Sequence, residues 1–119
     1  MSQSLQFPRI SFKVIKEDRD SNDNLTYREF EDGTWVKWKR DDHGRVVNTT
    51  DSHGSWSNDE YDANGKHTRH EDSKGNWLNK KYDEKGLQIY SESSNGEWEY
   101  TRYNDQGKII GKLINKVYD

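Results

Sequence analysis

The chain has 119 residues, of which 28% are hydrophobic, 34% charged and 13% aromatic, so it is long enough for one domain and too rich in aromatic residues to be disordered. The formal net charge of −3 argues against the basic surface that is typical of a protein that binds duplex nucleic acid. The lack of cysteine excludes disulfides and thiolate chemistry, and no apolar run approaches the roughly 20 residues that a membrane span needs.

Residues 1–11 contain Pro8, the single proline of the chain, and are expected to form an N-terminal arm or an edge strand. They show no continuous apolar stretch after a basic start, so we expect no secretory signal and a cytoplasmic location. Residues 12–32 are interpreted as a degenerate copy of the repeat described next. In this copy Asp20 and Asp23 occupy the positions of the Asp/Asn and the second Gly of the later copies.

A 21-residue repeat organises residues 33–116 into four clear copies, so residues 1–119 are expected to form a single β-repeat domain. One position of the repeat holds Trp35, Trp56, Trp77 and Trp98. Another holds Tyr61, Tyr82 and Tyr103, with Arg40 in the first copy. Two further positions hold Gly33, Gly54, Gly75 and Gly96, and Gly44, Gly65, Gly86 and Gly107.

Most of these glycines end a four-residue Asp/Asn/Ser-x-x-Gly segment, such as Asp62–Gly65. An Asp, Asn or Ser at the first position accepts a hydrogen bond from the backbone two residues on, and the Gly supplies a positive φ. A type I turn followed by a left-handed Gly closes a β-hairpin. With a turn every 10 or 11 residues, the sequence predicts an all-β antiparallel meander of hairpins with strands of about six or seven residues.

The middle copies are too polar for a two-layer sandwich, because Trp56 and Tyr61 are the only large apolar side chains between Gly54 and Lys74. We therefore expect a thin sheet that is either a single layer or is closed or coiled so that aromatic side chains stack between repeats. The Trp and Tyr positions are five residues apart, so a regular strand places them on opposite faces, and a bulge could rejoin them. The four Trp side chains are expected to form a ladder, with the intervening strand packed between its rungs through Val47, Thr68, Ile89 and Ile110 or their neighbours.

The sequence has no nucleophile elbow, phosphate-binding glycine loop or zinc-finger spacing, so we expect no enzymatic activity and no cofactor. His43 and His53 fall in predicted turns. His67 and His70 are three residues apart and would lie on opposite faces of a regular strand. We therefore expect solvated histidines and no metal site, with a transition-metal site as the alternative. The aspartates of the turns are expected to cap backbone N–H groups rather than to bind Ca²⁺.

The segments Gly54-x6-Tyr61-Asp62-x-x-Gly65 and Gly75-x6-Tyr82-Asp83-x-x-Gly86 resemble the YD repeat of Rhs-type polymorphic-toxin shells. The resemblance covers about residues 33–113 and implies hairpins wound into one spiralling antiparallel sheet. Four or five copies are too few for the hollow cocoon of the large members. Small stand-alone chains of this kind are similar to proteins encoded by phages and mobile elements. The Gly-x-Trp spacing also resembles choline- and glucan-binding repeats, which implies carbohydrate binding.

These observations favour a non-enzymatic protein that binds a larger partner, such as a phage-encoded inhibitor of a bacterial defence complex of the anti-CRISPR type. The alternatives are a carbohydrate- or cell-wall-binding module and a remnant or cognate of a YD-repeat toxin shell. Trp38 and Tyr100 are the predicted partner-binding residues, because they are aromatic residues at positions where the other copies have none. A homodimer or a contact with the partner is also expected through an edge strand at one end of the sheet, near Phe12 or near Leu113–Tyr118.

Overall fold

The computed structural model describes residues 13–116, all of whose secondary structure consists of β-strands and turns. No helix in this part of the chain is long and apolar enough to cross a membrane. The predicted arm at residues 1–11 and the predicted edge residues Phe12 and Tyr118 lie outside the described residues.

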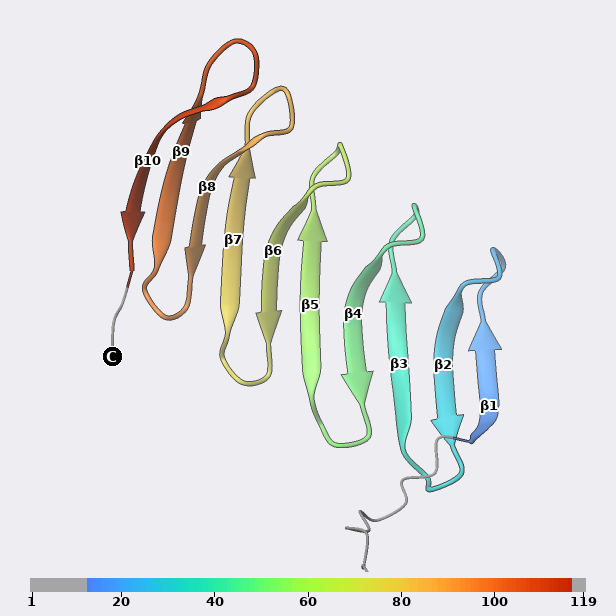
Figure 1. Cartoon of the computed structure of the whole chain (residues 1–119). Helices are drawn as coiled ribbons and strands as arrows, with labels where there is room; N and C mark the ends of the chain where they lie inside the picture. Colours follow the sequence, from blue (N-terminus) through green and yellow to red (C-terminus); the bar gives the residue numbers. More distant parts are fainter. Residues whose placement is uncertain (1–12, 117–119) are drawn as a thin grey trace, which may run out of the picture. The chain divides into compact units, whose positions relative to one another are not determined.

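The chain divides into two compact units, the first ending at Gly54 and the second beginning at Ser55. The first unit contains β1 (Val14–Arg19), β2 (Leu25–Phe30), β3 (Trp35–Arg40) and β4 (Val46–Asp51). The second unit contains β5 (Trp56–Tyr61), β6 (His67–Asp72), β7 (Trp77–Tyr82), β8 (Gln88–Ser93), β9 (Trp98–Tyr103) and β10 (Ile109–Asn115). Within each unit the strands pair antiparallel with their neighbours in sequence order, which confirms the predicted all-β meander (Figure 1).

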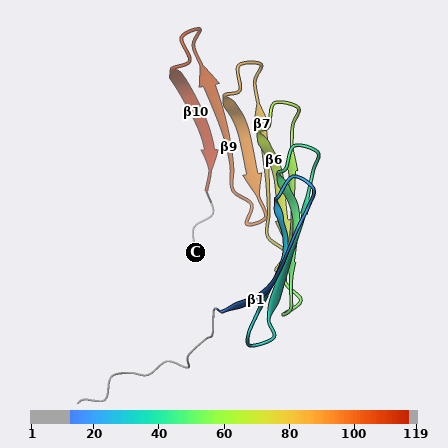
Figure 2. The same ribbon diagram turned by 90° about the vertical axis from the view of Figure 1, so that its right-hand side faces the viewer.

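Each unit is a single open layer of strands. Figure 2 turns the ribbon by 90° and shows the strands of the second unit as one curved sheet. No hydrophobic side chain among residues 13–116 is buried, and the one buried residue in this range is Thr101, with an exposed fraction of 7%. The predicted thin, single-layer sheet is therefore confirmed for each unit. Stability comes from the hydrogen-bond ladder, the turns and half-buried side chains rather than from a hydrophobic core.

The turns have the backbone geometry that the glycine pattern predicts. The eight glycines of the two repeat positions all have φ between 80° and 90°. In the degenerate copy, residues 12–32, Asp23 occupies the second glycine position with φ 66°. It is the one non-glycine residue with positive φ among the described residues. The agreement in φ between Asp23 and the repeat glycines supports the interpretation of residues 12–32 as a degenerate copy of the repeat.

Replacing Asp23 with Gly should raise the free energy of unfolding by about 1 kcal/mol, because Gly adopts a left-handed conformation without the steric cost of Cβ. The hydrogen bond from Arg19 Nη1 to the Asp23 backbone oxygen, at 3.0 Å, is available to Gly as well. The Asp23 side chain is 88% exposed and its carboxylate lies 4.0 Å from Arg19 Nε, so its loss costs little. Urea unfolding measures the change. The control is Asn22→Gly, one residue earlier in the same turn; an equal gain from both substitutions would contradict the assignment.

Carboxylate and amide side chains hold the turns from inside. Asp62 Oδ1 accepts hydrogen bonds from the backbone N–H groups of Asn64 and Lys66, both at 2.9 Å. Asp20, Asp41 and Asp83 accept the same pair of bonds, as does the neutral Asn104. The pKa of Asp20 is lowered, first by the backbone N–H of Asn24. The turn aspartates therefore act as caps, as the sequence predicts.

Each hairpin contains a β-bulge at the same repeat position. In β6, for example, His67 lies opposite Tyr61 and Arg69 lies opposite Glu60, so Thr68 is the extra residue. The equivalent extra residues of the other hairpins are Thr26, Val47, Ile89 and Ile110. The bulges lie in the even-numbered strands and not in β3, β5, β7 or β9, so the repeat Trp and Tyr side chains stay on opposite faces.

The predicted packing of the Trp ladder is wrong. Val47, Thr68, Ile89 and Ile110 are bulge residues, at the far end of the strands from Trp. Three of the four repeat Trp residues lie opposite a glutamate, in the pairs Glu29–Trp35, Glu71–Trp77 and Glu92–Trp98. The face of Trp77 is covered by the Arg69 guanidinium, 5.9 Å from the ring centre. Trp56 remains 40% exposed.

Two repeat tyrosines link the three successive hairpins of the second unit. Tyr82 Oη donates to the backbone oxygen of His67 at 2.8 Å, and Tyr103 Oη donates to the backbone oxygen of Gln88 at 2.6 Å. In the first unit Arg40 takes the same role, because its Nε donates to the backbone oxygen of Leu25 at 3.0 Å. These carbonyls lie beside the bulges, beyond the regular pairing of the neighbouring strands, and would otherwise lack a strand partner.

Candidate functional site

A groove of about 1120 Å³ lies on the second unit, on the side of the sheet that carries Trp77 and Trp98. Four of its residues, one from each of β7 to β10, lie directly opposite one another and form a row across the sheet. We call Lys81, Tyr90, Tyr100 and Leu113 the aromatic row.

The aromatic row offers large apolar surfaces to solvent. The ring centres of Tyr90 and Tyr100 are 4.5 Å apart, and Trp98 packs edge-on against Tyr100 at 5.6 Å. Lys81 Nζ lies 5.7 Å from the centre of the Tyr90 ring, which is a cation–π distance. Tyr100 is 51% exposed and Leu113 is 63% exposed. Trp, Tyr and Arg carry most of the binding energy of protein interfaces, and the groove is lined by Tyr90, Tyr100 and Arg102.

A polar network runs beside the aromatic row and fixes its orientation. Arg69 Nη1 donates to Asn79 Oδ1 at 2.6 Å, and Asn79 Nδ2 donates to Glu92 Oε1 at 3.3 Å. Tyr90 Oη donates to Glu92 Oε2 at 2.9 Å. This hydrogen bond to a carboxylate raises the pKa of Tyr90 to about 12, so the phenol is a neutral donor at every physiological pH.

The groove opens onto β10, the last strand of the second unit. This strand pairs with β9 on one side, and no described strand of the unit pairs with its other side. Four of its seven residues are exposed aliphatic residues: Ile109, Ile110, Leu113 and Ile114, with exposed fractions from 44% to 65%. An exposed apolar edge is a template for pairing with another extended chain.

The two predicted partner-binding residues have different surroundings. Tyr100 lies in the middle of the groove, on the Trp side of β9. Trp38 is half-buried in β3, in the first unit, on the face of that strand opposite to the one that carries Trp35. Sequence reasoning missed Tyr90, which pairs with Tyr100. A signal was available, because Tyr27 and Glu29 precede Tyr90 and Glu92 by three repeat lengths and make the same hydrogen bond, at 2.7 Å.

Sequence reasoning also missed a pair of hydrogen bonds to a serine at three of the four repeat Trp positions. Ser73 Oγ accepts from Trp56 N at 3.1 Å, while Ser73 N donates to Trp56 O at 2.9 Å. The same two bonds join Ser52 to Trp35 and Ser94 to Trp77. The 21-residue spacing of these serines is visible in the sequence.

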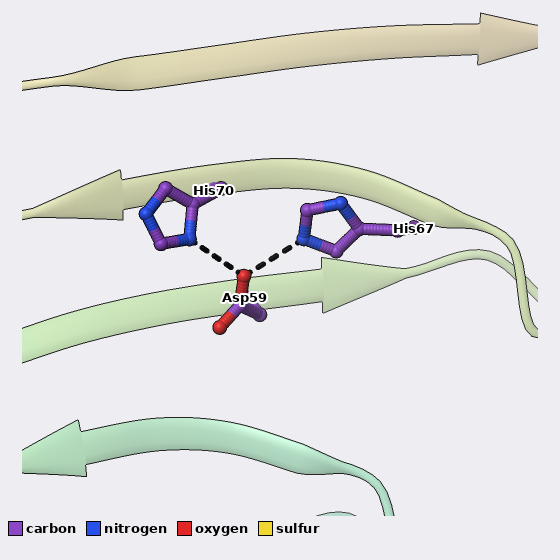
Figure 3. Close-up of side chains that lie close together, drawn as sticks. All are labelled: Asp59, His67 and His70. Carbon is purple, nitrogen blue, oxygen red and sulfur yellow. Dashed lines mark hydrogen bonds and ion pairs between the residues drawn. The ribbon is translucent and has the colours of Figure 1, made fainter.

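On the opposite side of the second unit, two histidines converge on one carboxylate (Figure 3). His67 Nε2 lies 2.7 Å from Asp59 Oδ1, and His70 Nδ1 lies 2.8 Å from the same oxygen. The prediction that the two histidines lie on opposite faces of the strand is wrong. The bulge at Thr68 inserts one residue between them and so turns both side chains to the same face.

The comparisons with known proteins show a likeness of fold. No protein-family model matches the chain, and no curated protein matches it. The fold is similar to that in the crystal structure of TcdB2-TccC3-TEV, with a TM-score of 0.66 over 83% of this chain and 15% sequence identity. TcdB2-TccC3 is an Rhs/YD-repeat toxin complex. The chain spans 5% of the length of that neighbour. The likeness therefore extends to a YD-repeat-like β-hairpin fold.

Proposed function

We propose that this chain is a non-enzymatic protein-binding protein, which holds an extended segment of a partner protein along β10 and in the adjoining groove. The observation that supports this most directly is the aromatic row, which ends at the open edge of β10. Backbone hydrogen bonds to the edge would give affinity, and side-chain contacts with the row would give specificity. Tyr100 and Leu113 would be the apolar anchors, and Lys81 and Arg102 would supply positive charge at the groove.

The finer form of the proposal is an inhibitor that occludes a surface of a larger bacterial complex in the cytoplasm of the host cell. Support comes from the resemblance of the sequence to small stand-alone repeat proteins of phages and mobile elements. An anti-CRISPR protein would act in this way. Expression in a bacterium with an active CRISPR system should then restore plating of a targeted phage, and the variant Tyr100→Asn should not.

The binding surface can be tested with a displayed library of random peptides. Peptides enriched on the wild-type chain should lose about 30-fold in affinity on Tyr100→Asn, the loss expected of an interface hot spot worth about 2 kcal/mol. The fold should persist, because Asn58 and Asn79 occupy the same repeat position in other copies. The matched comparison is Trp38→Thr, which takes its residue from Thr101 and should leave peptide binding unchanged.

The carbohydrate-binding alternative predicts a different outcome. Glycan arrays should then show binding that depends on the exposed Trp56, and no enriched peptide should depend on Tyr100. That result would contradict the proposed function.

The toxin-shell alternative is favoured by the fold likeness to TcdB2-TccC3. This alternative predicts a gene for a long YD-repeat protein beside the gene for this chain. Sequencing of the flanking DNA tests whether such a gene is present.

A further inference from the structure

We propose that Asp59, His67 and His70 form a binding site for one divalent transition-metal ion, with Zn²⁺ as the reference ion. The site is independent of the proposed peptide groove. Adjacent side chains of a strand point to opposite faces. Glu71 lies opposite Trp77 and so shares the groove face. The adjacent His70 and its cross-strand partner Asp59 therefore lie on the other face of the sheet.

The donor set is the one that transition metals prefer. Two imidazole nitrogens and one carboxylate oxygen lie within 4.8 Å of one another. Zn²⁺ binds such atoms at about 2.0–2.2 Å in a tetrahedron, and three protein ligands leave the fourth position open. Mixed nitrogen and oxygen donors with two histidines favour Zn²⁺, Cu²⁺, Ni²⁺ or Co²⁺ over Mg²⁺ and Ca²⁺, which prefer oxygen.

The backbone holds the three ligands in place before any ion binds. His70 is directly opposite Asp59 in the β5–β6 ladder, and the bulge at Thr68 brings His67 to the same face. The backbone oxygen of His67 is held by Tyr82 Oη at 2.8 Å. Ligands on strands are positioned more accurately than ligands on loops, so little ordering remains to be done on binding.

The second nitrogen of His70, Nε2, faces another carboxylate, which leaves Nδ1 for ligation. In the metal-free arrangement Asp59 Oδ1 accepts a hydrogen bond from each imidazole, so the facing nitrogens carry the hydrogens. When an ion binds, these hydrogens transfer to the other ring nitrogens. His70 Nε2 lies 3.8 Å from Asp72 Oδ2, an ion-pair distance rather than a hydrogen bond, and the negative charge on that side of the ring favours a hydrogen on Nε2.

The repeat itself shows that the fold does not require these residues. The three ligand positions are filled in the other copies by side chains of different types, which rules out a general structural role. The Asp59 position holds Trp38, Lys80 and Thr101; the His67 position holds Val46, Gln88 and Ile109; the His70 position holds Thr49, Ser91 and Lys112. Ligand-type residues at all three positions are confined to the second copy.

The experiment titrates the full-length chain with Zn²⁺ by calorimetry and with Co²⁺ by visible absorption. We expect one ion per chain. The variants Asp59→Thr, His67→Gln and His70→Ser each take their residue from another copy. They should weaken binding at least about tenfold, since even a carboxylate behind a ligand changes affinity about 10–100-fold. The control is His53→Asn, which removes a turn histidine of the first unit and should bind Zn²⁺ like the wild type.

Equal binding by the wild type and the three variants would overturn the proposal, and so would no binding by the wild type. A second measurement uses the wild-type chain alone, so it does not depend on the folding of the variants. Zn²⁺ should shift the ring-nitrogen NMR signals of His67 and His70 and leave those of His43 and His53 in place. Equal shifts at all four histidines would mean non-specific surface binding and would also overturn the site.

Discussion

Replacing Gly86 with Val should lower the free energy of unfolding by at least about 2 kcal/mol, the largest effect that we expect from a single turn substitution. Gly86 has φ +84°, and a left-handed conformation costs a residue with Cβ roughly 1–2 kcal/mol, with more for a β-branched residue. An added Cβ would also lie 3.2 Å from Lys66 Cε, so the lysine side chain would have to move. Gly65, with φ +83°, should behave in the same way.

The control for this substitution is Gly111→Val. Gly111 does not have a positive φ, and an added Cβ meets nothing within 4 Å. It lies in β10, where a β-branched residue is favourable, so the change in stability should stay within about 0.5 kcal/mol. Thermal unfolding followed by circular dichroism compares the variants. Equal melting temperatures for Gly65→Val, Gly86→Val and Gly111→Val would contradict the hairpin assignment.

Tyr82→Phe should lower the free energy of unfolding by about 1–2 kcal/mol, because it removes the hydroxyl that satisfies the backbone oxygen of His67. Burial raises the pKa of Tyr82, which agrees with a partly desolvated hydroxyl. Tyr103→Phe removes the equivalent bond to Gln88 and should have an effect of the same sign. Urea unfolding measures both changes.

The control is Tyr100→Phe, which removes a hydroxyl from a 51% exposed side chain and should change stability by less than about 0.5 kcal/mol. If Tyr82→Phe and Tyr100→Phe have the same small effect, the bond to His67 does not stabilise the stack of hairpins. The repeat tyrosine would then contribute to stability through the packing of its ring and not through its hydroxyl.

The hairpins and turns could be predicted from the sequence because their determinants are local. Asp62 and Gly65 lie within one four-residue segment, and together they define the turn wherever the segment is found in the chain. The 21-residue spacing also placed Asp23 at a glycine position of the repeat, and its φ of 66° confirms that placement. A repeat makes such local signals stronger, since each copy is an independent instance of the same turn.

The β-bulges, and the groups of side chains that they bring to one face, could not be predicted from such local signals. A bulge depends on which residue of one strand faces which residue of the next, and a shift of one residue moves a side chain to the other face. Regular alternation separated His67 from His70 and gave no reason to join them to Asp59. Similarly, the sequence shows Tyr90 and Glu92 as a repeat of Tyr27 and Glu29, but the contact between Tyr90 and Tyr100 follows only from the strand register.

The absence of buried hydrophobic side chains from residues 13–116 has a consequence for the thermodynamics of unfolding. The heat capacity of unfolding rises with the apolar surface that becomes newly hydrated, and is about 12–15 cal/mol/K per residue for proteins with an ordinary core. In this chain much of the apolar surface is already in contact with water in the native state. The heat-capacity increment of unfolding per residue is therefore small. The curve of the free energy of unfolding against temperature is shallow, and this free energy falls only weakly on cooling.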